Sequence, residues 1–153
     1  MARFTHPAVW GSGSSEEGTW TIEGGTLSDP QPTFSGAPLF SGHYSVLGNL
    51  CHFAIDVDMD NILTFGTGQY YMKLPFASNH NIVLSDGCLH DASTGNQYAI
   101  IGHIVENSDI MHLFSIASNG QHTPFSDSDN SPIKLAVDDS FHIAGTFEIE
   151  HNH

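Results

Sequence analysis

Residues 42–58 read GHYSVLGNLCHFAIDVD, and this stretch decides the fold class. After residue 50 its apolar side chains recur at every second position, at Cys51, Phe53, Ile55 and Val57. A period of two is typical of a strand that turns one face to a core and the other to water. Gly48 and Asn49 interrupt the alternation and favour a two-residue turn that can take positive φ. The stretch therefore predicts an antiparallel hairpin whose second strand is half-buried.

Short runs of the same kind continue along the rest of the chain. They are TWTIE (19–23), NILTF (61–65), QYYMKL (69–74), NIVL (81–84), GCLH (87–90), QYAIIGHIVE (97–106), IMHLFSIA (110–117), IKLAV (133–137) and FHIAGTFEIE (141–150). No segment of about 10 to 15 residues has apolar positions at helical spacing between capping residues. We therefore predict an all-β protein, an antiparallel two-sheet β-sandwich that is jelly-roll-like and has roughly eight to ten strands.

One domain is expected from 153 residues, because chains of this size usually form a single core. We predict an N-terminal arm and flexible linker over 1–19, the β-sandwich over 20–150 and a short tail over 151–153. The arm contains Phe4, Val9 and Trp10, and the linker-like GSGSSEEGT (11–19) follows it. Two interpretations of the arm stay open: it buries Trp10 against another surface, or it is a frayed terminus.

The charge balance excludes some classes of partner. Only three residues are Lys or Arg, against 17 Asp and Glu, and the formal net charge is -14. Nucleic acids and anionic lipids are bound through Lys and Arg, so we expect no nucleic-acid or membrane-surface role. No apolar run reaches the roughly 18 residues of a membrane span, and no signal-peptide pattern opens the chain. The acidity suits a basic protein partner, or serves solubility alone.

Neither the cysteines nor the acidic and histidine-rich stretches form a metal motif. Cys51 and Cys88 lack zinc spacing and are expected to be buried or half-buried thiols, with a disulfide between them as the alternative. In DVDMDN (56–61), a calcium loop would need Gly where Asn61 stands and Glu where Thr67 stands. We expect solvated carboxylates there, and no metal or cofactor.

Eleven histidines are many for this length, yet none forms a helical zinc pair, and HNH (151–153) is a terminal tripeptide rather than a nuclease motif. We expect His52, His103 and His142 on polar faces, as surface or subunit contacts. A histidine near the axis of a trimer would be the exception, because three copies could bind one ion.

No motif for catalysis stands out, and we expect the protein not to be an enzyme. The chain lacks a GxSxG elbow, and among 17 carboxylates the sequence cannot name a glycosidase pair. Tyr71 and Gln97 are candidates for contact with a ligand or glycan, since aromatic rings stack on sugars and amides bind hydroxyls. Core packing or subunit contact is the alternative for the tyrosine.

Several motifs follow one another in a characteristic order between about residues 18 and 149. They are GTWTIE (18–23); Gly42, Tyr44, Gly48 and Asn49 of the hairpin; Leu74 to Ser78 (LPFAS); and Ile143, Gly145, Thr146, Phe147 and Glu148 near the end. Pro75 is expected to end a strand, and Gly145 to mark a bulge or a close backbone approach. This order resembles small β-sandwich domains of tailed-phage virion proteins, found in tail-fibre tips, head fibres and capsid decoration (cement) proteins.

The resemblance implies a homotrimer on the exterior of a virion, without catalytic residues. Fewer than 20 residues precede the predicted domain, and no fibrous shaft is present, so we expect a capsid decoration protein. Its arm, with Phe4, Val9 and Trp10, would anchor it to the major capsid protein or another virion protein. The alternative is a receptor-binding tip of a tail or head fibre, in which loops 93–97 and 119–131 bind host surface glycan.

Overall fold

The chain folds into antiparallel β-strands, which the computed structural model describes over residues 15–128 and 131–150. The strands are β1 (Ser15–Gly18), β2 (Gly24–Ser28), β3 (Thr33–Phe34), β4 (Leu39–Leu47), β5 (Leu50–Asp58), β6 (Ile62–Thr64), β7 (Thr67–Lys73), β8 (Ile82–His90), β9 (Gln97–Ile104), β10 (Ile110–Ile116), β11 (His122–Pro124) and β12 (Ser140–Glu148). These residues form no helix that is long and apolar enough to cross a membrane. The predicted all-β class is confirmed.

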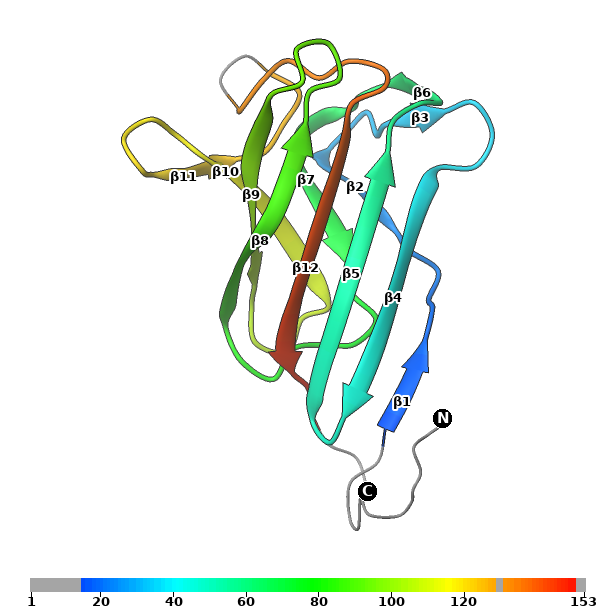
Figure 1. Cartoon of the computed structure of the whole chain (residues 1–153), viewed down its shortest axis with the longest axis vertical. Coiled ribbons are helices and arrows are strands. Elements are labelled where there is room, and N and C mark those ends of the chain that lie inside the picture. Colours follow the sequence, from blue (N-terminus) through cyan, green and yellow to red (C-terminus); the bar gives the residue numbers. More distant parts are fainter. Residues whose placement is uncertain (1–14, 129–130, 151–153) are drawn as a thin grey trace.

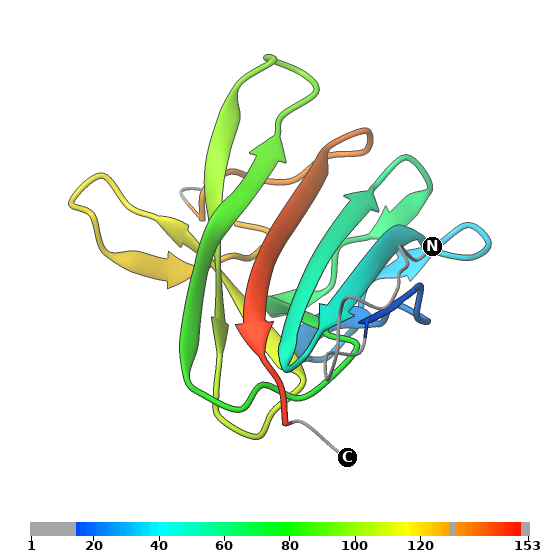
Figure 2. The ribbon, with the colours of Figure 1, turned by 60° about the horizontal axis from the view of Figure 1, so that its bottom comes forward.

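One curled sheet makes most of the molecule. It contains ten strands in the order β1-β4-β5-β12-β8-β9-β10-β7-β2, with β11 beside β10, while β3 and β6 pair separately. Figure 1 shows β4, β5, β12 and β8 as a front layer, with β7 and β2 behind it. Figure 2 shows the same curl from the end at which β12 finishes. The buried side chains lie between the two layers, as in a β-sandwich.

The predicted hairpin is the centre of the front layer. Gly48 has φ of 63° at the first turn position, and Leu47 pairs with Leu50 across the turn. A glycine with positive φ at this position is typical of a type II′ turn, whose twist suits a hairpin. Cys51 and Ile55 on β5 are fully buried, whereas His52, which points to the other face of the strand, is exposed. The alternation in the sequence thus predicted the core face correctly.

Gly42 shows why this stretch tolerates no side chain at its start. A Cβ at Gly42 would lie 2.7 Å from the carbonyl oxygen of Ala54 on β5 and 2.7 Å from Cδ1 of Ile22. The carbonyl belongs to the neighbouring strand and cannot move without breaking the ladder. The close packing of Ile22 onto β4 therefore requires glycine at this position.

Residues 15–18, which we expected within the flexible linker, instead form β1. Ser15 pairs with Leu47 and Gly18 with Tyr44, so β1 extends the sheet beyond β4. The Tyr44 hydroxyl donates a hydrogen bond to Oε2 of Glu16 at 2.8 Å. Composition suggested a linker, but the open edge of β4 supplies backbone partners that a local pattern does not show. The rest of the arm, 1–14, and the tail, 151–153, lie outside the described residues.

Two predicted strands are irregular instead. Trp20 and Ile22 pack against the core as expected, but their segment makes no strand, and Trp20 Nε1–H donates to the carbonyl oxygen of Lys73 at 3.1 Å. Residues 133–137 are also outside every strand, although Leu135 is buried. The carboxylate of Asp127 accepts the Leu135 N–H at 2.9 Å, so a side chain replaces the ladder partner.

Residues 82–90, predicted as two short strands, form the single strand β8 with a register shift between Leu84 and Gly87. A Cβ at Gly87 would lie 2.6 Å from the carbonyl oxygen of Ile100, so glycine permits the close approach at this irregularity. Gly145, by contrast, pairs in regular register with Phe53. Of the two alternatives predicted for Gly145, the bulge does not form, and the close approach is made by the side chain of Leu84, 2.9 Å from the place of a Cβ, rather than by backbone.

Candidate functional site

The end of the sandwich at the β4–β5 turn, which we call the turn end, combines exposed apolar side chains with the first and last described segments of the chain. Leu47 and Leu50 flank the turn and are 45% and 43% exposed. Ser15, the first described residue, pairs with Leu47, and the Ile149 N–H donates to the carbonyl oxygen of Asn49 at 2.7 Å. The arm of residues 1–14 therefore joins the fold beside two exposed leucines.

Both described lysines lie beside carboxylates. Lys73 Nζ is 3.4 Å from Oε1 of Glu23 and 4.0 Å from Oδ2 of Asp109, and Lys134 Nζ is 2.8 Å from Oδ2 of Asp127. The two pairs of Lys73 are exposed on both sides and add little stability. The paired carboxylates neutralise the charges of Lys73 and Lys134 locally. The unpaired carboxylates then make the described surface negative.

A surface groove of ≈ 460 Å³ runs beside the start of β2. It is lined by Ile22, Glu23, Gly24, Pro38, Phe40, Tyr71, Lys73 and Ile110. The lining sets the Tyr71 ring and other apolar groups beside the Glu23–Lys73 ion pair. A polyhydroxylated ligand with one apolar face would find both kinds of contact there.

The structure does not bring Tyr71 and Gln97 close together. Tyr71 pairs with His112, which pairs with His103 on the far side of β10, and Gln97 lies six residues farther along β9. Six residues of strand span about 20 Å. The Gln97 side chain instead accepts a hydrogen bond from the Cys88 thiol at 3.4 Å.

The acidic stretch after β5 folds back on itself. The Asp60 N–H donates to Oδ1 of Asp58 at 2.9 Å, while Asp56 stays on the strand opposite Ser41 and His142. A hydrogen bond between the Asp60 and Asp58 side chains is the largest cause that raises the pKa of Asp60 to about 6, followed by desolvation and the nearby Asp138. Asp56 and Asp60 are exposed and Asp58 is half-buried, and Asp58 and Asp60 converge with Asp138 from a distant loop, which the spacing of two did not show.

No group of three or more His, Cys, Asp and Glu side chains in residues 15–128 and 131–150 is arranged to hold a metal ion. The nearby charges of Asp58 and Asp138 repel a charge on Asp60, which adds to the rise of its pKa. That repulsion has a consequence for stability that depends on pH.

Asp60→Asn is expected to raise the melting temperature at pH 7.5 and to leave it unchanged near pH 4. The raised pKa means that the folded state binds the Asp60 proton more tightly than the unfolded chain, in which an aspartate pKa is about 3.9. Stability from this group is complete below about pH 4 and is lost as pH rises through 6. Thermal melts from pH 4 to 8 measure the difference, with Asp56→Asn as the control for charge alone. A difference that stays constant with pH would contradict the assignment.

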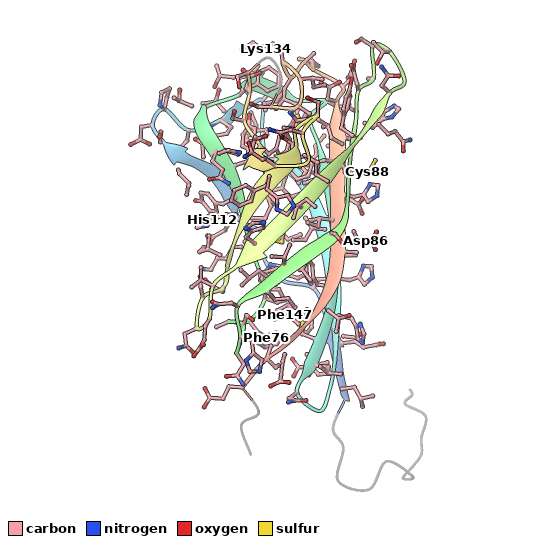
Figure 3. All side chains as sticks on the ribbon, turned by 90° about the vertical axis from the view of Figure 1, so that its left-hand side faces the viewer. Phe76, Asp86, Cys88, His112, Lys134 and Phe147 are labelled. Atoms are coloured by element: carbon pink, nitrogen blue, oxygen red, sulfur yellow. The ribbon has the colours of Figure 1, made fainter. Side chains whose placement is uncertain are left out.

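The outer face of the front layer carries the predicted polar histidines. His52 and His142 are exposed, and Nδ1 of His52 lies 2.6 Å from the Thr146 hydroxyl. Figure 3 shows Cys88 and Asp86 at the edge of the view formed by this layer, and His112 away from that edge. His103 differs from the other two, because it is half-buried and hydrogen-bonded to another histidine.

Both cysteines are free thiols, so the disulfide alternative is wrong. Cys51 is fully buried on the core face of β5, and burial raises the pKa of its thiol to about 12. Cys88 is half-buried. A raised thiol pKa keeps Cys51 protonated at neutral pH, which suits a packing role.

Comparison with known proteins adds no assignment to this geometry. The chain matches no protein-family model and no curated protein.

Proposed function

We propose that this protein is a non-enzymatic virion structural protein, a homotrimeric capsid decoration protein of a tailed phage that binds the outer shell. The observation that carries the proposal is the turn end, where the 14-residue arm joins the fold beside the exposed Leu47 and Leu50. Exposed apolar side chains beside the attachment point of an arm are typical of a surface that binds another protein. The resemblance of the ordered sequence motifs to phage virion domains supplies the class of partner.

The mechanism is attachment by an arm and stabilisation by mass action. Phe4, Val9 and Trp10, which lie outside the described residues, would bury apolar surface in the major capsid protein, with Leu47 and Leu50 extending the contact. Three arms in one trimer would bind with avidity. A protein that binds the assembled shell but not its separated subunits stabilises the shell by its binding free energy.

Trp10→Ala is expected to reduce the occupancy of the protein on purified particles while leaving the sandwich folded. Trp10 is the largest apolar side chain of the arm, so its replacement by alanine removes the largest single contribution to the area that the arm can bury. Occupancy is measured by gel densitometry of particles incubated with each variant, and the fold by circular dichroism. A combined Leu47→Ala and Leu50→Ala variant should lose occupancy too.

Leu63→Ala is the matched control, because Leu63 is 64% exposed but lies on β6, away from the turn end. Full occupancy of the Trp10 variant would overturn the proposed attachment. Light scattering of the free protein tests the trimer directly, since three copies of a 16.6-kDa chain are readily distinguished from one.

The groove beside β2 favours a second candidate, the receptor-binding tip of a tail or head fibre. Its Tyr71 ring and its Glu23–Lys73 pair are suited to the apolar and hydroxyl faces of a sugar. A glycan array with the isolated protein distinguishes the two functions. A decoration protein gives no signal, whereas a receptor-binding tip gives a signal that Tyr71→Ala abolishes.

A further inference from the structure

Three histidines gather on the outer surface of β9, β10 and β11. His103 on β9 is directly opposite His112 on β10. Nε2 of His103 lies 3.0 Å from Nδ1 of His122 on β11, so the two imidazoles share one proton. The His103 ring also stacks on Phe114, with centroids 4.0 Å apart and an interplanar angle of 29°. Figure 3 faces this side of the molecule and labels His112.

We propose that His103 and His122 form a binding site for a divalent transition-metal ion such as Zn²⁺ or Ni²⁺, with His112 as a third ligand. Imidazole nitrogen is a preferred ligand of both ions. The described residues hold no ready group of three ligands, so His112 joins by rotation of its side chain, whereas the pair is already in place.

The separation of the two nitrogens fits one ion. With metal–nitrogen bonds of about 2.0–2.1 Å, two adjacent ligands of a tetrahedral or octahedral ion lie about 2.9–3.4 Å apart. The observed 3.0 Å between Nε2 of His103 and Nδ1 of His122 falls in this range. A metal ion can therefore replace the shared proton once the two rings turn, because each nitrogen lone pair must point to the ion rather than along the line between the nitrogens.

The surroundings keep the pair ready to bind. The stacking on Phe114 holds the His103 ring in orientation. The net charge of -14 favours cations over anions near the surface.

A metal here would join two strands that do not pair with each other. β9 and β11 both pair with β10, and β11 makes only the three-residue ladder from Phe114–Pro124 to Ile116–His122. A bridge from His103 to His122 therefore clamps the β10–β11 hairpin onto the sheet. Binding to the folded state alone raises the free energy of unfolding with metal concentration.

Titration of the isolated, chelator-treated protein with ZnCl₂ or NiCl₂ alone tests the proposal by calorimetry and by thermal melts. All variants carry His151→Ala and His153→Ala, because the terminal HNH would bind metal by itself. The parent is expected to bind one ion and to melt at a higher temperature when about 100 µM metal is present. A site with a Kd in the micromolar range would stabilise the fold measurably at a concentration of this order. His103→Ala and His122→Ala should each weaken binding by about tenfold or more, and His112→Ala by a smaller factor.

His142→Ala is the matched control, an exposed histidine on the other layer, and should leave binding unchanged. The proposal is overturned if the parent binds no metal, if the His103 and His122 variants bind within about twofold of the parent, or if His142→Ala weakens binding equally. The test does not depend on the virion role, since it is read on the free protein.

Discussion

Phe125→Ala is expected to lower the free energy of unfolding by about 3–5 kcal/mol. Phe125 is fully buried although it lies just after β11, outside every strand. Its ring meets Tyr70 and Phe141 edge-on, with centroids 5.2 and 5.4 Å apart. These two rings also line a cavity of ≈ 30 Å³, so the void left by alanine adjoins space that is already poorly filled.

The loss comes from packing rather than from the backbone. The Phe125 N–H donates to Leu113 and its carbonyl oxygen accepts from Tyr70, and alanine retains both bonds. Urea unfolding at 25 °C measures the effect. Phe125→Leu should cost less, because it refills part of the volume, and the exposed Leu63→Ala should stay within about 0.5 kcal/mol of the parent. A loss under about 1 kcal/mol for Phe125→Ala would show that the segment does not pack as described.

Asp139→Ala is expected to cost about 2–4 kcal/mol, because it leaves two backbone donors without their partner. The Asp139 side chain is 1% exposed, and its carboxylate accepts the N–H groups of Ala92 at 2.9 Å and Ala136 at 2.8 Å. Its own carbonyl oxygen accepts from the Met59 N–H at 3.1 Å. One residue therefore ties three loops together at the end of the sandwich opposite the turn end.

Asp139→Asn keeps the volume of the side chain but changes its hydrogen bonds, so it separates the two contributions to the free energy of unfolding. Its amide oxygen keeps one acceptor while its NH₂ faces the second donor, so we expect roughly half of the loss seen with alanine. Asp86→Ala, an exposed aspartate on β8, controls for removal of one negative charge. Equal stability of the Asp139 and Asp86 variants would exclude the role of Asp139 as a loop tie.

The local pattern predicted strands where alternation was long and regular, and it was less successful where side chains replace ladder partners. β5 and β12 alternate over nine residues each and were correctly assigned to core and solvent faces. Residues 133–137 have apolar strand formers, but Asp127 and Asp139 accept their backbone N–H groups instead. Ser15–Gly18 show the reverse case, because a sequence with linker composition pairs with an available strand edge.

The candidate sites were less accessible to sequence reasoning. His103 was singled out, but its partner His122 lies 19 residues away on another strand, and no spacing rule joins them. Tyr71 was also singled out, yet its groove is completed by Pro38 and Phe40 from the start of β4. Alternation in each strand carried one usable signal, since it placed His103 on the outer face, where it can meet a neighbour.

The sequence by itself determined the β class, the turn at Gly48 and Asn49, and which side chains of each regular strand face the core. These properties are local, because the direction of a side chain follows from its position along its own strand. Only the tertiary structure decided which strands are neighbours, and so brought His52 to Thr146, 94 residues away, and His103 to His122. Backbone hydrogen bonds are the same for every residue type, so they do not specify which strands pair. The pairing is selected by the burial of whole apolar faces, which depends on the complete fold.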